Sequence, residues 1–88
     1  MQLTPTGNFK RNLKRLSVSD AEDTIAALEL FMTSPHAKSL NFEKVRSRKG
    51  YHTIRANYAI RVLLRETAPQ QFNIVAVGNH DYIYESFF

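Results

Sequence analysis

A cluster of basic side chains near the middle of the chain is the first group with a definable chemistry. Its members are Lys44, Arg46, Arg48 and Lys49, followed along the chain by Arg55 and Arg61. A guanidinium offers a planar fork of donors that matches phosphate oxygens, and lysine adds a compact positive charge. The cluster therefore indicates a phosphate-binding surface. A solvated turn between charged edge strands is the alternative.

A second group follows an apolar segment near the C-terminus. After residues 74–77, Gly78 allows the chain to turn, and His80 and Asp81 come next. Histidine is the side chain best suited to give and take protons near neutral pH, and Asp81 could orient it. A strand, a glycine and a histidine beside a basic face favour proton transfer at a phosphate. A purely structural His–Asp pair is the alternative.

Tyrosine and phenylalanine side chains accompany both groups. The tyrosines are Tyr51, Tyr58, Tyr82 and Tyr84, and the chain ends with Phe87 and Phe88. A tyrosine can stack on an exposed base and hydrogen-bond a phosphate, or it can pack in a core. Tyr84 lies four residues beyond His80, which keeps it near the candidate centre. The two terminal phenylalanines could fold back onto the sheet or form an apolar patch for a partner.

Composition limits the remaining possibilities. The chain has 88 residues, a net charge of +4 and no cysteine, so we expect one domain over residues 1–88 that meets polyanions. The histidines at positions 36, 52 and 80 are widely separated, and no P-loop or GxGxxG motif is present, so we predict neither a metal site nor a cofactor. No segment is long and apolar enough for a membrane span, which favours the cytoplasm.

Two helical segments must support these groups from one side. Phe9, Leu13 and Leu16 share one face of the first, whose other side is basic. Residues 19–22 fit a capping box that starts the second helix at Ser19. An apolar stripe of Ala21, Ile25, Leu28 and Met32, widened by Phe31, then runs to Pro35. The short connection between the two helices predicts an antiparallel helical hairpin.

The period changes after His36 to that of β-strands. Residues 40–46, 51–56, 59–66 and 72–77 have strand lengths and many β-branched or aromatic side chains, and residues 2–4 could add a short strand. Turns are expected at residues 47–50, 57–58 and 67–71, and such short connections make consecutive strands antiparallel. Residues 78–88 either extend the last strand or form a terminal turn.

Alternation along the strands predicts two different faces for the sheet. Ile60, Val62 and Leu64 point one way, while Arg61 and Arg65 point the other, together with Arg55 from the preceding strand. We therefore predict an α+β fold, in which an N-terminal antiparallel helical hairpin packs on a mainly antiparallel sheet of four to five strands. The opposite face would present the arginines.

Three segments of the C-terminal half resemble the toxins of the RelE/ParE superfamily. Residues 44–55 resemble the basic segment that enters the central strands of this family. Residues 58–64 resemble the family's strand with the pattern "y-R-v-l-y". Residues 75–84 resemble the closing segment, which contains a glycine, then a histidine or arginine, and then a tyrosine. The helical hairpin fits the N-terminal part of the same family. The resemblance implies a toxin that pairs with an acidic antitoxin as a hetero-oligomer.

The resemblance also implies roles for individual residues. RelE-like members cut mRNA on the ribosome without metal, by promoting attack of a 2′-OH on the adjacent phosphate. Arg61 matches the strand arginine that stabilises the phosphate, His80 matches the group that transfers a proton, and Tyr84 matches the tyrosine that packs in the protein or contacts RNA. Lys44, Arg46 and Arg48 match the basic segment approximately. The chain departs from some members in having no glutamate base on a central strand, since Glu66 lies at a strand end.

These residues lead to a main hypothesis and two others. The main hypothesis is a ribosome-dependent mRNA endoribonuclease with His80, Arg61, Arg55 and Tyr84 at the reaction centre and Lys44, Arg46, Arg48, Lys49 and Arg65 on the RNA backbone. The second is a ParE-like inhibitor of DNA gyrase, which would need no nuclease residues. The third is a non-catalytic module whose basic face only binds an antitoxin.

Overall fold

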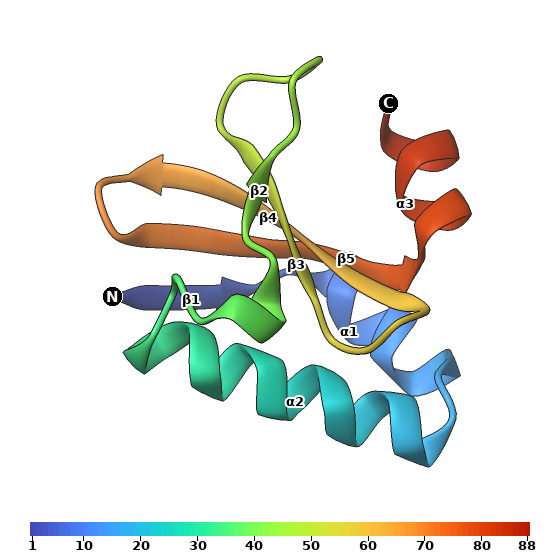
Figure 1. Ribbon diagram of the computed structural model, residues 1–88. Coiled ribbons are helices and arrows are strands. Elements are labelled where there is room, and N and C mark those ends of the chain that lie inside the picture. Colours follow the sequence, from blue (N-terminus) through green and yellow to red (C-terminus); the bar gives the residue numbers. More distant parts are fainter.

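The predicted sheet is present in the computed structural model, which describes all 88 residues (Figure 1). Its strands are β1 (Gln2–Pro5), β2 (Glu43–Lys44), β3 (Tyr51–Arg55), β4 (Ile60–Ala68) and β5 (Gln71–Asn79). They lie in the order β1-β5-β4-β3-β2. β1 runs parallel to β5, and all other neighbouring strands are antiparallel. The mainly antiparallel α+β fold is thus confirmed.

Helices cover both faces of this sheet. They are α1 (Gly7–Arg15), α2 (Val18–Thr33) and α3 (His80–Phe87), with a short 3-10 helix, η1 (Lys38–Leu40), before β2. Figure 1 shows α1 and α2 on one side of the sheet and α3 on the other. The main core lies under the helical hairpin, where Phe9 and Phe31 pack against Ile54, Val62 and Leu64. None of the helices is both long enough and apolar enough to cross a bilayer.

The start of α2 differs from the sequence prediction. The cap is Ser17, not Ser19, because Ser17 has an extended backbone and its hydroxyl accepts a hydrogen bond from the Asp20 N–H at 3.1 Å. The helix therefore begins two residues early, and α1 and α2 are separated by Leu16 and Ser17 alone. Figure 1 shows the chain turning back at this connection, from α1 into α2.

The buried face of α2 also differs from the predicted stripe. Thr24, Ala27, Leu28 and Phe31 are buried, while Ile25 and Met32 are exposed. The buried set follows the helical spacing as well as the predicted set does. Thr24 can be buried because its hydroxyl donates to the Asp20 carbonyl at 2.8 Å. A threonine whose hydroxyl bonds to its own helix can therefore lie in the core, although its polarity predicts an exposed position.

The ends of the strands account for the remaining differences. Of the segment predicted as a strand over residues 40–46, only Glu43 and Lys44 form a strand, β2, while Leu40 is the last residue of η1. The predicted loop over residues 67–71 is a tight turn, since Ala68 pairs with Gln71 and only Pro69 and Gln70 lie between them. Beyond Asn79 the chain forms α3 instead of a terminal turn, and this helix covers part of the face expected to be open.

One edge of β5 is completed by helix α1. β1 pairs with β5 only as far as Pro5, which lacks an N–H, so the backbone of β5 needs other partners beyond Ile74. Asn8 donates to the Val75 carbonyl at 3.0 Å, and the buried Asn12 accepts from the Val77 N–H at 3.1 Å. Asn12 also donates to the Tyr82 hydroxyl at 3.0 Å. Side-chain amides of α1 thus supply the hydrogen-bond partners that β1 no longer provides to β5.

We expect Asn12→Leu to lower the free energy of unfolding by about 1–3 kcal/mol, because it leaves the buried Val77 N–H without an acceptor. Urea denaturation monitored by circular dichroism measures the change. Lys14→Ala, at an exposed position of the same helix, is the control and should stay within about 0.5 kcal/mol of the unsubstituted protein. Equal stability of the two variants would contradict this role of Asn12.

Candidate functional site

His80 lies at the junction between the last strand, β5, and the last helix, α3. Asn79 caps α3, because its side-chain oxygen accepts from the Tyr82 N–H at 2.8 Å. The buried Gly78 allows α3 to pack directly on the end of the sheet, since a Cβ at this position would lie 2.5 Å from the Tyr82 ring. His80 is the first residue of α3, and its side chain is 65% exposed. The geometry thus presents the imidazole to solvent from a fixed backbone.

The contacts of His80 come from its own helix. Its ring stacks on the ring of Tyr84 with centroids 4.5 Å apart, as the one-turn spacing predicts. Its Nδ1 lies 3.5 Å from the carboxylate of Asp81, and both side chains are largely exposed. The face of the imidazole is therefore held, while its ring nitrogens remain accessible to a ligand.

Arg55 and Arg61 lie at the same end of the sheet as His80. They are paired with each other across β3 and β4, and Arg61 is paired with Gly78 across β4 and β5. The guanidinium of Arg61 donates to the carbonyl oxygens of Asn57, Tyr58 and Ile60 at 2.9, 3.3 and 3.2 Å. Arg61 thus closes the β3–β4 turn, while Arg55 is exposed and forms no ion pair.

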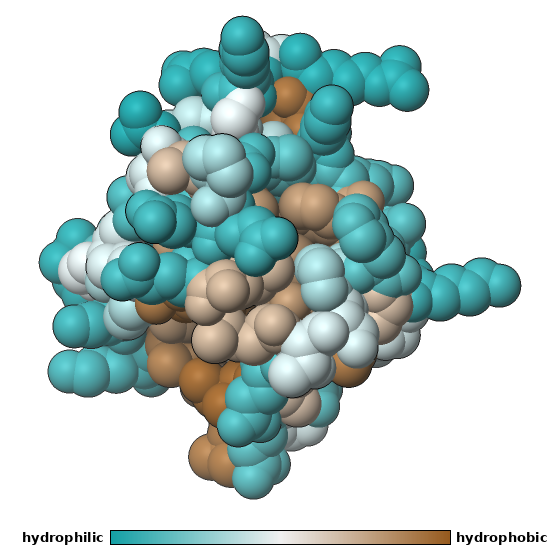
Figure 2. All heavy atoms as spheres, turned by 90° about the vertical axis from the view of Figure 1, so that its left-hand side faces the viewer, coloured by the Kyte–Doolittle hydropathy of each residue, from teal (hydrophilic) through white to brown (hydrophobic).

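Four more of the predicted basic residues border a groove at the other end of the sheet. This groove has a volume of about 720 Å³ and lies between the β2–β3 loop and the β4–β5 hairpin. Its charged or titratable lining consists of Lys44, Arg46, Arg48, Lys49, Tyr51, His52 and Glu66. Figure 2, which faces this end of the molecule, shows hydrophilic side chains gathered at the top and apolar atoms lower down.

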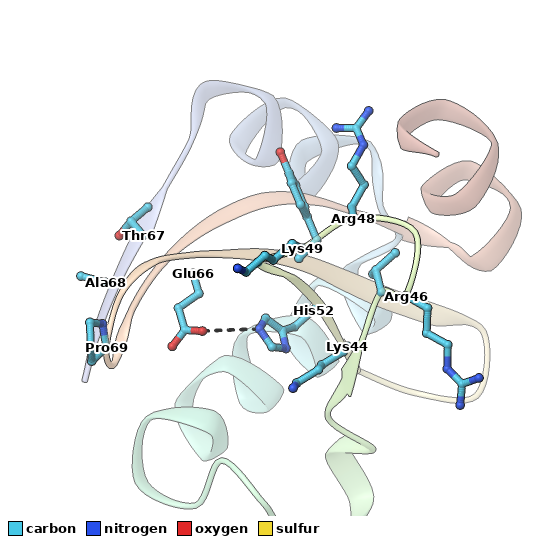
Figure 3. Close-up of a pocket in the computed structure, with 12 residues that line it drawn as sticks. Lys44, Arg46, Arg48, Lys49, His52, Glu66, Thr67, Ala68 and Pro69 are labelled. Atoms are coloured by element: carbon cyan, nitrogen blue, oxygen red, sulfur yellow. Dashed lines mark ion pairs between the residues drawn. The ribbon is translucent and has the colours of Figure 1, made fainter.

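Two of the groove residues form a pair that the sequence analysis did not identify. The Nε2 of His52 lies 3.6 Å from a carboxylate oxygen of Glu66, and Figure 3 shows the two side chains facing each other. His52 is only 7% exposed, and its ring stacks on Phe42 with centroids 4.8 Å apart. Its Nδ1 is buried without a hydrogen-bond partner. The pair could have been found from the β3–β4 register, which places His52 opposite Leu64, two residues before Glu66.

Burial lowers the pKa of His52, and this effect outweighs the attraction of Glu66, which raises the pKa. The charge of Lys44 lowers the pKa further. His52 is therefore neutral at neutral pH, and the negative charge of Glu66 faces the groove without a cationic partner in the pair.

Rings on the outer face of the sheet connect the two ends. Tyr51 has the guanidinium carbons of Arg48 and Arg65 each 5.9 Å from its ring centre. Its ring also meets the ring of Phe88 at 5.7 Å, and Phe88 lies 5.9 Å from Tyr84, the partner of His80. Arg65, which does not line the groove, thus joins it through Tyr51.

The structure therefore divides the predicted residues into two groups. His80, Tyr84, Arg55 and Arg61 lie toward one end of the sheet, and Lys44, Arg46, Arg48, Lys49 and Arg65 lie toward the other. Arg61 and Glu66 mark these ends on β4, and their five-residue separation corresponds to about 16 Å. The structure has no group of three His, Asp or Glu side chains arranged to hold a metal ion.

Comparisons with known proteins locate this fold among solved structures. No model of a protein family matches the sequence, and no curated protein matches it. The YoeB/ParE toxin from Agrobacterium tumefaciens is 18% identical, with a TM-score of 0.72 over 91% of this chain and 99% of that one. YafQ from E. coli is 14% identical, with a TM-score of 0.76 over 94% and 97%.

A third match comes from an antitoxin–toxin complex. The RelB–RelE complex from Methanococcus jannaschii contains a chain that is 17% identical to this one, with a TM-score of 0.73 over 97% of this chain and 99% of that chain. At these identities the likeness concerns the fold, and it extends over nearly the whole chain. The fold that the sequence resemblance implied is therefore confirmed.

The lowered pKa of His52 predicts how stability depends on pH. The unfolded chain takes up a proton on His52 at about pH 6.5, whereas the folded protein does so only at lower pH. The contribution of His52 is therefore constant above the unfolded pKa, and the free energy of unfolding falls as pH drops from there to the folded pKa. Urea denaturation between about pH 5 and pH 8 measures this fall.

The matched variants are His52→Gln and His36→Gln. The first should show a weaker decline of stability with acidification, and the second, at an exposed position, should retain the decline of the unsubstituted protein. An equally steep decline in His52→Gln would contradict the assignment.

Proposed function

We propose that this chain, which has the fold of the RelE/ParE superfamily toxins, is the toxin of a type II toxin–antitoxin system. We further propose that it is a metal-independent, ribosome-dependent mRNA endoribonuclease. The observation that carries the second part is His80: an exposed imidazole fixed on the first residue of α3, stacked on Tyr84, at the end of the sheet where Arg55 and Arg61 lie.

The chemistry of RNA cleavage fits these groups. When a ribose 2′-OH attacks the adjacent phosphorus, a P–O bond forms, the proton of the hydroxyl leaves, and the 5′-oxygen departs and takes up a proton. An accessible imidazole serves for either proton transfer. Cationic side chains stabilise the negative charge that grows on the phosphate oxygens. In this proposal His80 transfers a proton and the two arginines hold the phosphate.

The two arginines are not equally ready for this task. Arg55 is exposed and unpaired, so a phosphate can reach it directly. Arg61 must give up hydrogen bonds to carbonyls of the β3–β4 turn before its guanidinium can face a phosphate. We therefore assign the first phosphate contact to Arg55 and expect Arg61 to join when RNA is bound.

The proposed partners follow from the fold and the charge. Chains of similar fold are found with antitoxins in the RelB–RelE complex of Methanococcus jannaschii and the DinJ–YafQ complex of E. coli. A net charge of +4 suits an acidic antitoxin as well as RNA. Ribosome-bound mRNA is the proposed substrate, and the cytoplasm is the compartment where both would be met.

Inhibition of DNA gyrase is the second candidate, and the position of Arg61 favours it. A guanidinium held by three carbonyls has a structural role that needs no RNA. The only carboxylate paired with His80 is the exposed Asp81, which gives the imidazole little additional activation. A toxin that binds gyrase needs neither group to react.

His80→Ala should abolish growth inhibition upon induced expression if His80 transfers a proton, because the substitution removes the group and leaves the backbone of α3. Binding of the cognate antitoxin should persist, which shows that the variant is folded. Glu85→Gln, an exposed substitution on the same helix, is the control and should remain toxic. Growth assays with primer extension on cellular mRNA provide the readout.

Full toxicity of His80→Ala would reject the catalytic assignment. Linearised plasmid with intact mRNA after induction would identify gyrase as the target instead.

A further inference from the structure

We propose that the groove between the β2–β3 loop and the β4–β5 hairpin binds backbone phosphates of RNA together with a proton, which is taken up by the His52–Glu66 pair. This inference rests on the proposed function for the choice of RNA. It concerns a different group of side chains from the His80 centre. It assigns His52 and Glu66 to ligand binding and leaves the reaction to the other end of the sheet.

The composition of the groove indicates an anionic ligand. Its lining has four cationic side chains, Lys44, Arg46, Arg48 and Lys49, against a single carboxylate, that of Glu66. Figure 3 shows Lys44 and Lys49 extending on either side of the His52–Glu66 pair, whereas Arg46 points away from it. Phosphates are the anions that such a set of donors suits best, and RNA supplies them in series.

Glu66 opposes an anion in this groove as long as His52 is neutral. The carboxylate is 41% exposed, so its charge faces the space that a phosphate would occupy. A proton on His52, 3.6 Å away, creates an ion pair that offsets this charge. The phosphate in turn adds negative charge beside the imidazole, which favours the protonated form. Phosphate and proton therefore each strengthen the binding of the other.

The surroundings of His52 make it the group that titrates. The charged or titratable groups around it are Glu66 on β4, Lys44 on β2, Arg46, Arg48 and Lys49 in the loop, and His36 and the amino group of Met1 on the side of α2. The ring stacks on Phe42 and contacts the edge of Phe72, so it lies between two apolar rings. Burial keeps the imidazole neutral near pH 7 until an anion arrives.

The groove and the His80 centre are far enough apart to hold different nucleotides of one strand. The distance along β4 between the rows of Arg61 and Glu66 is about 16 Å, which exceeds the reach of one phosphate group. The rings of Tyr51, Phe88 and Tyr84 line the path between them and offer stacking surfaces for bases. The groove would thus grip the strand at a distance from the cleavage point.

The experiment measures binding of a labelled single-stranded 2′-O-methyl oligoribonucleotide by fluorescence anisotropy, at constant ionic strength. This probe lacks the attacking hydroxyl, so binding is separated from cleavage. Between about pH 7.5 and pH 5.5, the Kd of the unsubstituted protein should tighten by up to about tenfold, because a bound phosphate raises the pKa of His52.

Two variants should change the Kd in opposite directions relative to the unsubstituted protein, one at neutral pH and the other at acidic pH. Glu66→Gln should bind tightly already at neutral pH, because the repulsive charge is gone, and should respond weakly to acidification. His52→Gln should remain weak at acidic pH, because nothing offsets Glu66. His36→Gln is the matched control and should retain the full pH response. Lys49→Gln should weaken binding more than Arg46→Gln, because the Arg46 side chain points away from the His52–Glu66 pair.

The inference is overturned if the Kd of the unsubstituted protein is independent of pH, or if Glu66→Gln binds no more tightly than the unsubstituted protein at neutral pH. Glu66 is partly exposed, so this second variant remains informative even if His52→Gln fails to fold. Cleavage of mRNA with pH-independent binding would reject the groove assignment alone. Proton-linked binding without cleavage would reject the nuclease proposal alone.

Discussion

The structure depends on how the backbone of β5 finds hydrogen-bond partners after β1 has ended. A proline closes β1, and the chain turns at once into α1, so the edge of β5 beyond Ile74 would be buried and unpaired. Thr6, Asn8 and Asn12 supply the missing donors and acceptors from the start of α1. The same Asn12 reaches the Tyr82 hydroxyl on α3. A few amide groups thus fix α1, β5 and α3 relative to one another.

The position of the candidate centre follows from this arrangement. Tyr82 is held by Asn12 and lies against Gly78, where a side chain would push it away. α3 can therefore begin directly at the end of β5 and place His80 on its first turn. On the outer face of the sheet, Leu63 and Ala76 pack under Ile83 of the same helix, with Val45 anchoring the basic loop nearby. Both groups of candidate side chains thus rest on one small apolar cluster.

Sequence patterns predict the periodic parts of this protein and miss contacts made between elements. Alternation along β4 correctly separates Val62 and Leu64 from Arg61, because a strand has only two faces. α3 escapes prediction since its eight residues contain three aromatic rings at positions 82, 84 and 87 that also suit a strand. The pairing of His52 with Glu66 depends on strand register, and the free charge of Glu66 depends on burial of His52. Neither the strand register nor the burial of His52 can be predicted from the local composition of the sequence.

The parallel pairing of β1 with β5 has a consequence for the order in which the protein is made. Gln2 pairs with Gln71, and the Thr6 hydroxyl donates to the carbonyl of Ile74, 68 positions further along the chain. β5, an interior strand of the sheet, is synthesised after α1 and β4, so these two elements keep apolar faces uncovered until β5 joins the sheet. The sheet can therefore close only after β5 has been synthesised, which makes the pairing of β1 with β5 a late and slow step of folding.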